Sequence, residues 1–562
     1  MKTSLWFPIA LFLPLIGAAS FSVATANIYT VTSTADTGAG SFRNAITDAN
    51  NHAGPDTIQF NIPIADAGYS AVAGAWTIRP ETTLPTLTDG GTAIDGSSQT
   101  GNQGDRNLFG PEIELDGTKT TDAYGLTIRS ARSRLKGLVI NRFSVGIGIL
   151  GNVARDNVVV GNYIGTDVTG MMDVGNRLGG IFIRSGPRNN QIGDVTPEGR
   201  NIIGGTDTSF NLITGVGITL EDTDSNRVIG NFIGVNRIGN APIPNKSYGI
   251  CMYKCRYTVV GGLAPGERNV ISGNRGGVII RMLADGYNVV SGNFIGTDTS
   301  GTLNLGNNGN GISLDFGARK NTIGPGNVIA FNVGDGVKTA HDSTRFNHIT
   351  HNAIYNNIGI GIFNSGGGNR QITPPIIGSV KPAYVSGSAA ANSTVEVFSD
   401  SADEGAIYEG TATANASGVF VWNGSAHGPR ITATCTDDSG NTSEFSSAMV
   451  GVDEDKPPRD APSEFSLNQN YPNPFNPVTI IGYRVPVVSD VRLAVYDVLG
   501  RQVSVLVDRR EAAGTYETLF DASTLSSGWY LYRLTCSSVS PDQGIGMKTG
   551  AYISTRTMLL LR

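Results

Sequence analysis

The chain has 562 residues, a net charge of −6 and 16% charged residues, where an ordinary soluble domain has roughly 25%. Its length predicts about three to five domains, and so mild a charge balance provides no basic stripe for phosphates, which excludes nucleic acid as a partner. Glycine is abundant, at 74 residues. Because glycine and asparagine tolerate positive φ, the composition favours short strands and tight turns over a helical bundle.

The first 26 residues have the features of a secretory signal peptide. Lys2 precedes an apolar run over residues 5–16, and an Ala-x-Ala pattern ends at Ala26. We therefore expect cleavage between Ala26 and Asn27. The run is too short for a membrane span of about 20 residues, and no later stretch is long enough. The mature chain is expected to leave the cytoplasm, pass through the periplasm and contain no transmembrane span.

Residues 27–90 are expected to form an N-terminal cap. Residues 29–32 are predicted to form a strand, and residues 41–50 a short helix. Phe42, Ala45, Ile46 and Ala49 would share one face of that helix. An apolar face of this kind suits the end of a solenoid, whose first coil otherwise exposes its strand edges.

A three-part repeat recurs seven times between residues 157 and 363. Each unit has an apolar piece usually ending in Gly, then Asn with two apolar residues, then Gly with Ile or Val, and marker glycines recur every 31 to 37 residues. Three short apolar pieces cannot form a helix of period 3.6. The pattern predicts an all-β, right-handed parallel β-helix with coils roughly 4.8 Å apart. Weaker units extend it to about nine coils over residues 91–370.

Seven asparagines occupy the same place in successive units. We expect them to form a ladder whose amides bond along the stack and satisfy turn backbone groups, a structural rather than a ligand-binding role. They are Asn162, Asn201, Asn231, Asn269, Asn293, Asn327 and Asn352.

Residues 32–46 resemble the N-terminal segment of secreted bacterial right-handed β-helix repeat proteins. Residues 266–274 and 292–298 are similar to repeats of the same family. The resemblance extends over residues 29 to about 370. It implies the fold and export, but that family is not tied to one activity.

Two smaller β-sandwich domains are expected after the β-helix. Alternating apolar residues over 371–452 predict the first, and residues 431–446 resemble bacterial Ig-like modules. Residues 453–463 are rich in proline and charge and are interpreted as a linker. Residues 464–562 form the second predicted sandwich.

The last segment closely resembles the C-terminal sorting domain of the type IX (Por) secretion system. The similarity is carried by residues 467–477, 495–501 and the closing strand 558–562. It implies the secretion machinery as a partner, passage across the outer membrane, and release or surface attachment after the domain is cleaved. The link between residues 537 and 554 is longer than usual, which leaves the pairing of the final strand open.

The search for catalytic residues gives little. Parallel β-helices often act on polysaccharides, so polysaccharide lyases and glycosidases are the enzyme classes to consider. A Ca²⁺-dependent lyase needs clustered carboxylates with a basic partner, and a glycosidase needs two carboxylates about 5–9.5 Å apart. The best acidic cluster is Glu221, Asp222 and Asp224. It is a weak Ca²⁺ or ligand candidate, and a solvated turn is the simpler interpretation. No other cofactor or metal is indicated.

Two functions remain open from the sequence. A non-enzymatic surface or secreted protein, for adhesion or glycan binding, is favoured because no carboxylate cluster with a basic partner on neighbouring coils is evident. The alternative is an extracellular polysaccharide lyase or hydrolase. Cys251 and Cys255 have CxxxC spacing, which fits free thiols or a local disulfide but not a CxxC redox pair.

Overall fold

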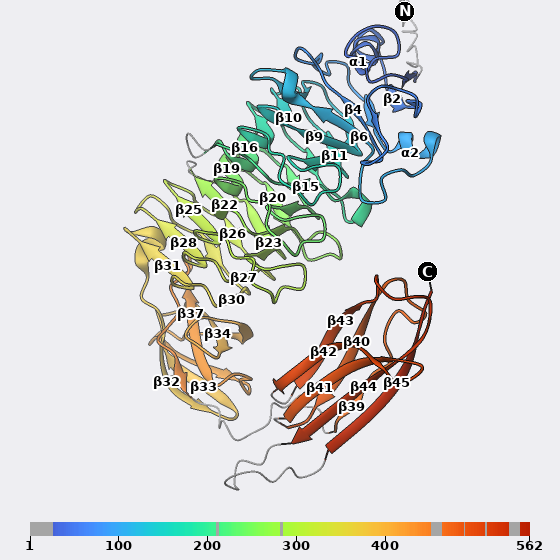
Figure 1. Ribbon diagram of the computed structural model, residues 1–562. Helices are drawn as coiled ribbons and strands as arrows, with labels where there is room; N and C mark the ends of the chain where they lie inside the picture. Colours follow the sequence, from blue (N-terminus) through green and yellow to red (C-terminus); the bar gives the residue numbers. More distant parts are fainter. Residues whose placement is uncertain are drawn as a thin grey trace, which may run out of the picture.

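The computed structural model describes residues 26–208, 213–281, 285–450, 464–487, 489–511, 514–538 and 551–561. Three long sheets account for the strands up to residue 365 (Figure 1). Sheet A contains β1 (Ile28–Val31), β2 (Thr57–Phe60), β5 (Ala93–Asp95), β8 (Arg134–Lys136), β11 (Val158–Val160), β14 (Gln191–Ile192), β17 (Arg227–Val228), β20 (Val259–Gly261), β23 (Val289–Ser291), β26 (Thr322–Ile323) and β29 (His348–Ile349).

Sheet B contains β3 (Tyr69–Ser70), β4 (Ala75–Ile78), β6 (Ile113–Asp116), β9 (Leu138–Asn141), β12 (Tyr163–Ile164), β15 (Ile202–Ile203), β18 (Phe232–Ile233), β21 (Val270–Ile271), β24 (Phe294–Ile295), β27 (Val328–Ala330) and β30 (Ala353–Tyr355). Sheet C contains β7 (Tyr124–Ile128), β10 (Val145–Leu150), β13 (Gly179–Arg184), β16 (Val216–Asp224), β19 (Tyr248–Arg256), β22 (Gly276–Arg281), β25 (Ile312–Asp315), β28 (Val337–Ala340) and β31 (Ile362–Ser365).

From β8 onward the chain passes from sheet A to sheet B to sheet C in each coil, and each strand pairs in parallel with its counterpart one coil earlier. Val158 pairs with Gln191, for example, and Tyr163 with Ile202. This arrangement is the parallel β-helix that the repeats predict. Sheet C has nine strands, whereas sheets A and B have eleven. The two longer sheets begin with strands inside the expected cap region 27–90, which carries no Asn marker.

Helix α1 (Phe42–Asn51) closes the N-terminal end of the β-helix as expected. Ser41 caps it by accepting a hydrogen bond from the Asn44 amide at 3.2 Å. Its four predicted apolar residues are buried in the core of the β-helix. Helix α2 (Ser98–Gln103) and three short 3₁₀ turns, η1 (Gly117–Lys119), η2 (Pro197–Gly199) and η3 (Gly368–Gln371), occupy loops.

The isoleucine that ends each Asn-containing marker points into the β-helix. Each is at most 1% exposed, and they form one column of the main core: Ile164, Ile203, Ile233, Ile271, Ile295, Ile329 and Ile354. Burial of such columns removes apolar surface from water along the whole stack, which is the main force that holds the coils together.

Two antiparallel β-sandwiches follow the β-helix. The first packs β32 (Ile376–Lys381), β33 (Tyr384–Ser388) and β36 (Val419–Asn423) against β34 (Thr394–Asp400), β35 (Ile407–Thr413), β37 (Arg430–Thr436) and β38 (Met449–Val450) around a shared core. The second packs β39 (Ser466–Leu467), β40 (Val478–Val485) and β43 (Gly514–Asp521) against β41 (Ser489–Asp497), β42 (Gln502–Glu511), β44 (Gly528–Ser538) and β45 (Ala551–Leu560).

The final strand β45 pairs antiparallel with β44 from Gly528–Leu560 to Ser537–Ala551, which resolves the pairing that the sequence left open. The expected signal peptide, apart from Ala26, and the expected linker 453–463 lie outside the described residues.

Candidate functional site

The seven marker asparagines line one corner of the β-helix between sheets A and B. They are at most 3% exposed. Each of the first six side-chain amides donates to the amide oxygen of the Asn one coil further on, at 2.8–3.1 Å, and the last, Asn352, donates to the Ile323 carbonyl at 2.8 Å. The amides also donate to backbone carbonyls of the turns, as Asn231 does to Ile192 at 2.9 Å. Every member is engaged in the stack, so none of these side chains is available to a ligand.

The other two corners also carry asparagine ladders, which the sequence reasoning missed. One contains Asn157, Asn190, Asn226, Asn288, Asn321, Asn347 and Asn369. The other contains Asn245, Asn274, Asn307, Asn332 and Asn357. A signal for the first was present, because in four coils an Asn stands five residues before the marker Asn, as Asn157 does before Asn162.

The acidic residues singled out from the sequence lie at the end of β16. Glu221 points outward and pairs with Arg184 of the preceding coil, with Nε and Oε2 2.9 Å apart. Asp222 and Asp224 are exposed. Among the described residues, no group of three His, Cys, Asp or Glu side chains could hold a metal ion. Glu221 is therefore neutralised by an arginine, and the structure offers no support for a Ca²⁺ site here.

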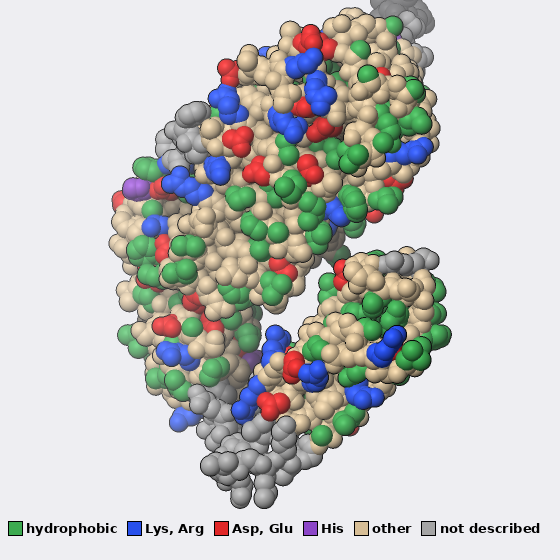
Figure 2. Space-filling model, viewed as in Figure 1, with side chains coloured by type: hydrophobic (Ala, Val, Ile, Leu, Met, Phe, Trp, Pro, Cys, Tyr) green, Lys and Arg blue, Asp and Glu red, His purple; other side chains and the backbone are tan. Residues whose placement is uncertain are grey.

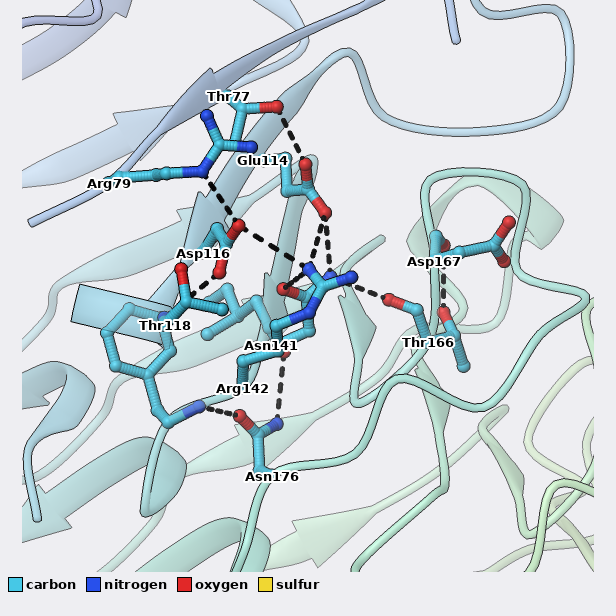
Figure 3. A network of polar contacts seen from close by, with 12 residues as sticks. Thr77, Arg79, Glu114, Asp116, Thr118, Asn141, Arg142, Thr166, Asp167 and Asn176 are labelled. Carbon is cyan, nitrogen blue, oxygen red and sulfur yellow. Dashed lines mark hydrogen bonds and ion pairs between the residues drawn. The ribbon is translucent and has the colours of Figure 1, made fainter. Parts of the chain in front are cut away.

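A denser polar network lies on the outer face of sheet B, where β4, β6 and β9 pair (Figure 3). Glu114 and Asp116 are two residues apart on β6 and point to the same side. Glu114 accepts hydrogen bonds from Thr77 Oγ1 at 2.8 Å and Asn141 Nδ2 at 2.9 Å. The sequence search did not identify this pair, although its Glu-x-Asp spacing on a predicted strand was readable.

Two arginines on neighbouring coils complete the network. Arg79 Nε lies 3.0 Å from Asp116 Oδ2, and Arg142 Nη1 lies 3.6 Å from a carboxylate oxygen of both Glu114 and Asp116 (Figure 3). The sequence therefore wrongly indicated that no carboxylate cluster meets a basic partner on adjacent coils. All four carboxylate oxygens nevertheless have partners, with Asp116 Oδ1 accepting from the Thr118 amide at 3.0 Å, which suits cross-linking of coils better than acid–base chemistry.

A second group of carboxylates with a base comes from three successive coils. Asp173 follows β12, Asp207 follows β15 and Lys246 follows β18. Burial raises the pKa of Asp173, the charge of Asp207 adds to that rise, and Lys246 opposes it. A carboxyl with a raised pKa next to a second carboxylate is an arrangement that glycoside hydrolysis uses.

The surface of the β-helix is mixed in character. Figure 2 shows basic and acidic side chains interspersed over the visible face, with hydrophobic side chains between them. Several aromatic rings are exposed between sheet C and sheet A, namely Tyr257 at 56%, Phe316 at 45% and Tyr287 at 44%. With Lys320 and His341 they define what we call the corner surface.

Tyr257 and Tyr287 occupy the same place in successive coils. Their rings are stacked, with centroids 5.6 Å apart and planes at 6°. Lys320 fills this place one coil later, with its Nζ 5.3 Å above the Tyr287 ring and 3.0 Å from the Tyr287 hydroxyl. One coil earlier the place belongs to Ser225, whose side chain is smaller than the rings that follow it.

A second aromatic–cation group lies at the end of sheet C in the same coils. The rings of Phe316 and His341 are 4.3 Å apart, and the Arg281 guanidinium lies 4.6 Å above the Phe316 ring. His341 Nε2 is 3.1 Å from Asp315 Oδ1. Arg281 is 7% exposed and lies 3.8 Å from Asp315, so the exposed ring faces are what this group offers to the apolar face of a ligand.

The backbone of the corner surface is strained at its tyrosines. The residue before each Asn-ladder position at this corner is left-handed, with φ between 50° and 61° at Arg132, Asp156, Asn189, Ser225, Tyr257, Tyr287, Lys320 and Phe346. Asp and Asn tolerate this conformation, whereas other residues lose roughly 1–2 kcal/mol there. Burial of the rings does not offset that cost at Tyr257 and Tyr287. The same conformation recurs at all eight positions, so the stack imposes it on the tyrosines as it does on the other residues of this corner.

The fold and these surfaces define an all-β solenoid protein with two appended β-sandwiches. Residues 469–541 match the family model described as the secretion system C-terminal sorting domain. The chain is thus an exported protein, sorted by the type IX pathway to the cell surface or the exterior. Within the described residues, no helix is long and apolar enough to cross a membrane.

Other comparisons add little. No curated protein matches the chain. Among solved structures, a dimeric latent PorU from Porphyromonas gingivalis is 16% identical, with a TM-score of 0.14 over 34% of this chain and 20% of that one. A tetra-tandem repeat from the extending region of a large adhesion protein is 18% identical, with a TM-score of 0.14 over 33% of this chain and 48% of that one. This chain thus spans less than two thirds of either structure, and likenesses this weak carry no functional argument.

Proposed function

We propose that this chain is a non-enzymatic binding protein, delivered by type IX secretion, whose β-helix attaches to glycans through the corner surface. In this proposal the signal peptide is removed after Ala26, and the sorting domain, residues 464–562, is cleaved when the protein reaches the surface or the exterior. The ligand is a polysaccharide or a cell-surface glycan.

The observation that carries the proposal is the exposed tyrosine pair, Tyr257 and Tyr287. The flat, apolar face of a sugar ring packs well on an aromatic face, and stacking on a protein ring contributes about 1–3 kcal/mol for the analogous case of nucleic acid bases. The side of Tyr257 that faces Ser225 is the place for such a ring. Lys320 and Arg281 beside the aromatic rings already pair with Asp285 and Asp315, at 3.1 and 3.8 Å, so the ring faces rather than these cations would hold the sugar.

A second candidate function is a polysaccharide lyase or hydrolase. Asp173, Asp207 and Lys246 favour it, because two carboxylates and a base meet from successive coils and the pKa of one carboxyl is raised. Binding and catalysis make opposite predictions about turnover, so one experiment separates them.

The test uses the purified mature protein against a panel of neutral and acidic polysaccharides, with and without Ca²⁺. Retention on immobilised polysaccharide measures binding, while new reducing ends and ultraviolet absorbance of unsaturated products measure cleavage. Binding with no turnover is the expected result. Turnover that disappears in Asp173→Asn and persists in an Asp222→Asn control would replace the proposal with the enzymatic one. Failure to bind any member of the panel would also contradict the proposal.

A further inference from the structure

The last coil of the β-helix ends in three strands that have no further coil to pair with. These strands are β29, β30 and β31, which stand last in sheets A, B and C. Their outward-facing amides need acceptors, since an unpaired strand edge is a template for association with another chain. A solenoid end therefore requires a cap.

The first β-sandwich supplies acceptors to all three strands. Thr442 Oγ1 accepts from the Ile349 amide of β29 at 2.9 Å. The Gly405 carbonyl accepts from the Ile354 amide of β30 at 2.9 Å. At β31, Glu444 Oε1 accepts from the Asn364 amide at 2.8 Å.

Glu404 occupies the position of the next asparagine in a ladder. Within that ladder, the Asn332 amide and side chain both donate to Asn357 Oδ1, at 3.2 and 2.9 Å. Asn357 is the last member, and its amide and side chain donate in the same way to Glu404, at 3.1 and 3.2 Å. A carboxylate suits this place better than an amide, because it only accepts hydrogen bonds, whereas an amide also donates and no further coil follows to accept from it.

Glu396 closes the corner of the marker ladder. It is 4% exposed, accepts from the His351 amide at 3.0 Å, and also bonds the Thr350 hydroxyl. Behind these polar contacts, Phe445 packs against the core of the β-helix. The cavity left between Phe398, Phe445 and the last coil measures about 10 Å³, which is room for one water at most.

We propose that the first β-sandwich is the C-terminal cap of the β-helix, with Glu396, Glu404 and Glu444 serving as the acceptors of an absent next coil. Its role is to seal the end of the β-helix and to prevent two β-helices from joining end to end through β29, β30 and β31. Figure 1 shows the sandwich seated directly on that end.

Native-state hydrogen exchange of the mature protein tests the cap. In Glu404→Ala, hydrogen exchange of the Asn357 amide should accelerate at least about tenfold. The Asn269 amide, in the middle of the marker ladder, should keep its protection. Asp438→Ala, at an exposed site of the same sandwich, is the matched control and should change neither amide. Equal protection of Asn357 in wild type and Glu404→Ala would overturn the assignment of Glu404.

The anti-association role is tested with the triple variant Glu396→Ala, Glu404→Ala and Glu444→Ala. Light scattering after chromatography should show a concentration-dependent dimer or larger species that the Asp438→Ala control lacks. A folded triple variant that stays monomeric up to high concentration would overturn this role. If the triple variant does not fold, hydrogen exchange of Glu404→Gln replaces it. This variant retains one acceptor oxygen, so the Asn357 amide must exchange at a rate between those of wild type and Glu404→Ala. A wild-type rate at Asn357 would contradict the proposal.

Discussion

Replacing one ladder asparagine should strongly destabilise the β-helix, although the side chain touches no ligand. Asn293 sits in the middle of its stack and is fully buried. Its oxygen accepts from the Asn269 amide, and its side-chain nitrogen donates to the carbonyls of Val260 and Ser291 at 2.9 Å. Asn293→Ala removes the partner of all three backbone groups.

The magnitude follows from the desolvation cost of those groups. A buried polar group left without a partner costs about 1–3 kcal/mol, and a water that enters the new cavity recovers part of it. We therefore expect Asn293→Ala to lower the free energy of unfolding by about 3–5 kcal/mol. Asn308→Ala, at an exposed site of the same coil, should stay within about 0.5 kcal/mol of wild type.

Urea unfolding followed by circular dichroism measures this difference, with the transition of the β-helix fitted apart from those of the sandwiches. The reasoning fails if Asn293→Ala unfolds at the same urea concentration as Asn308→Ala. That result would mean that the column of isoleucines holds the coils in register and the ladder contributes nothing.

Three further predictions concern pH, thiols and export. Burial raises the pKa of Glu404 to about 7, so near neutral pH the folded state holds a proton that the unfolded state has lost. The free energy of unfolding should therefore fall by about 1–3 kcal/mol between pH 5 and 8. Glu404→Gln should lose this part of the pH dependence, whereas an unchanged pH dependence would show that other groups cause it. All four cysteines are buried and free, and burial raises the pKa of Cys251 to about 12. A thiol reagent at pH 8 should therefore label the chain only after unfolding, and rapid labelling of the folded protein would contradict this. Deletion of residues 464–562 should trap the chain in the periplasm, as fractionation would detect; normal delivery to the surface would show that a different segment directs export.

The repetitive part of the fold could be predicted because each coil repeats the same local chemistry. The Asn162-Tyr163-Ile164 marker and its counterparts place a polar side chain at a corner and an isoleucine inside, and stacking then aligns like with like. The strands before residue 91 lack the marker, so the repeats place the start of the β-helix at residue 91, whereas sheets A and B already begin at β1 and β3. The alternation that predicts the sandwich strands is equally local.

The missing parts of the site depend on contacts between distant residues. Nothing in the sequence near Glu404 indicates that it meets Asn357 of the last coil, because that pairing exists only after the sandwich docks. Glu114 and Arg142 likewise meet across coils. The left-handed φ of Tyr257 and Tyr287 contradicts their local preference and is imposed by the stack, so the corner surface could not be predicted from residue type.

The most direct test of the account is the affinity of the mature protein for a polysaccharide that it retains, measured by titration calorimetry. Tyr257→Asn with Tyr287→Asn places a residue that tolerates the left-handed backbone at both sites, so we expect equal or higher stability and at least about a tenfold loss of affinity. Phe109→Asn removes another exposed aromatic ring, which lies 4.8 Å below the Arg237 guanidinium, and should leave the affinity unchanged. Wild-type affinity in the tyrosine variant would contradict glycan binding at the corner surface.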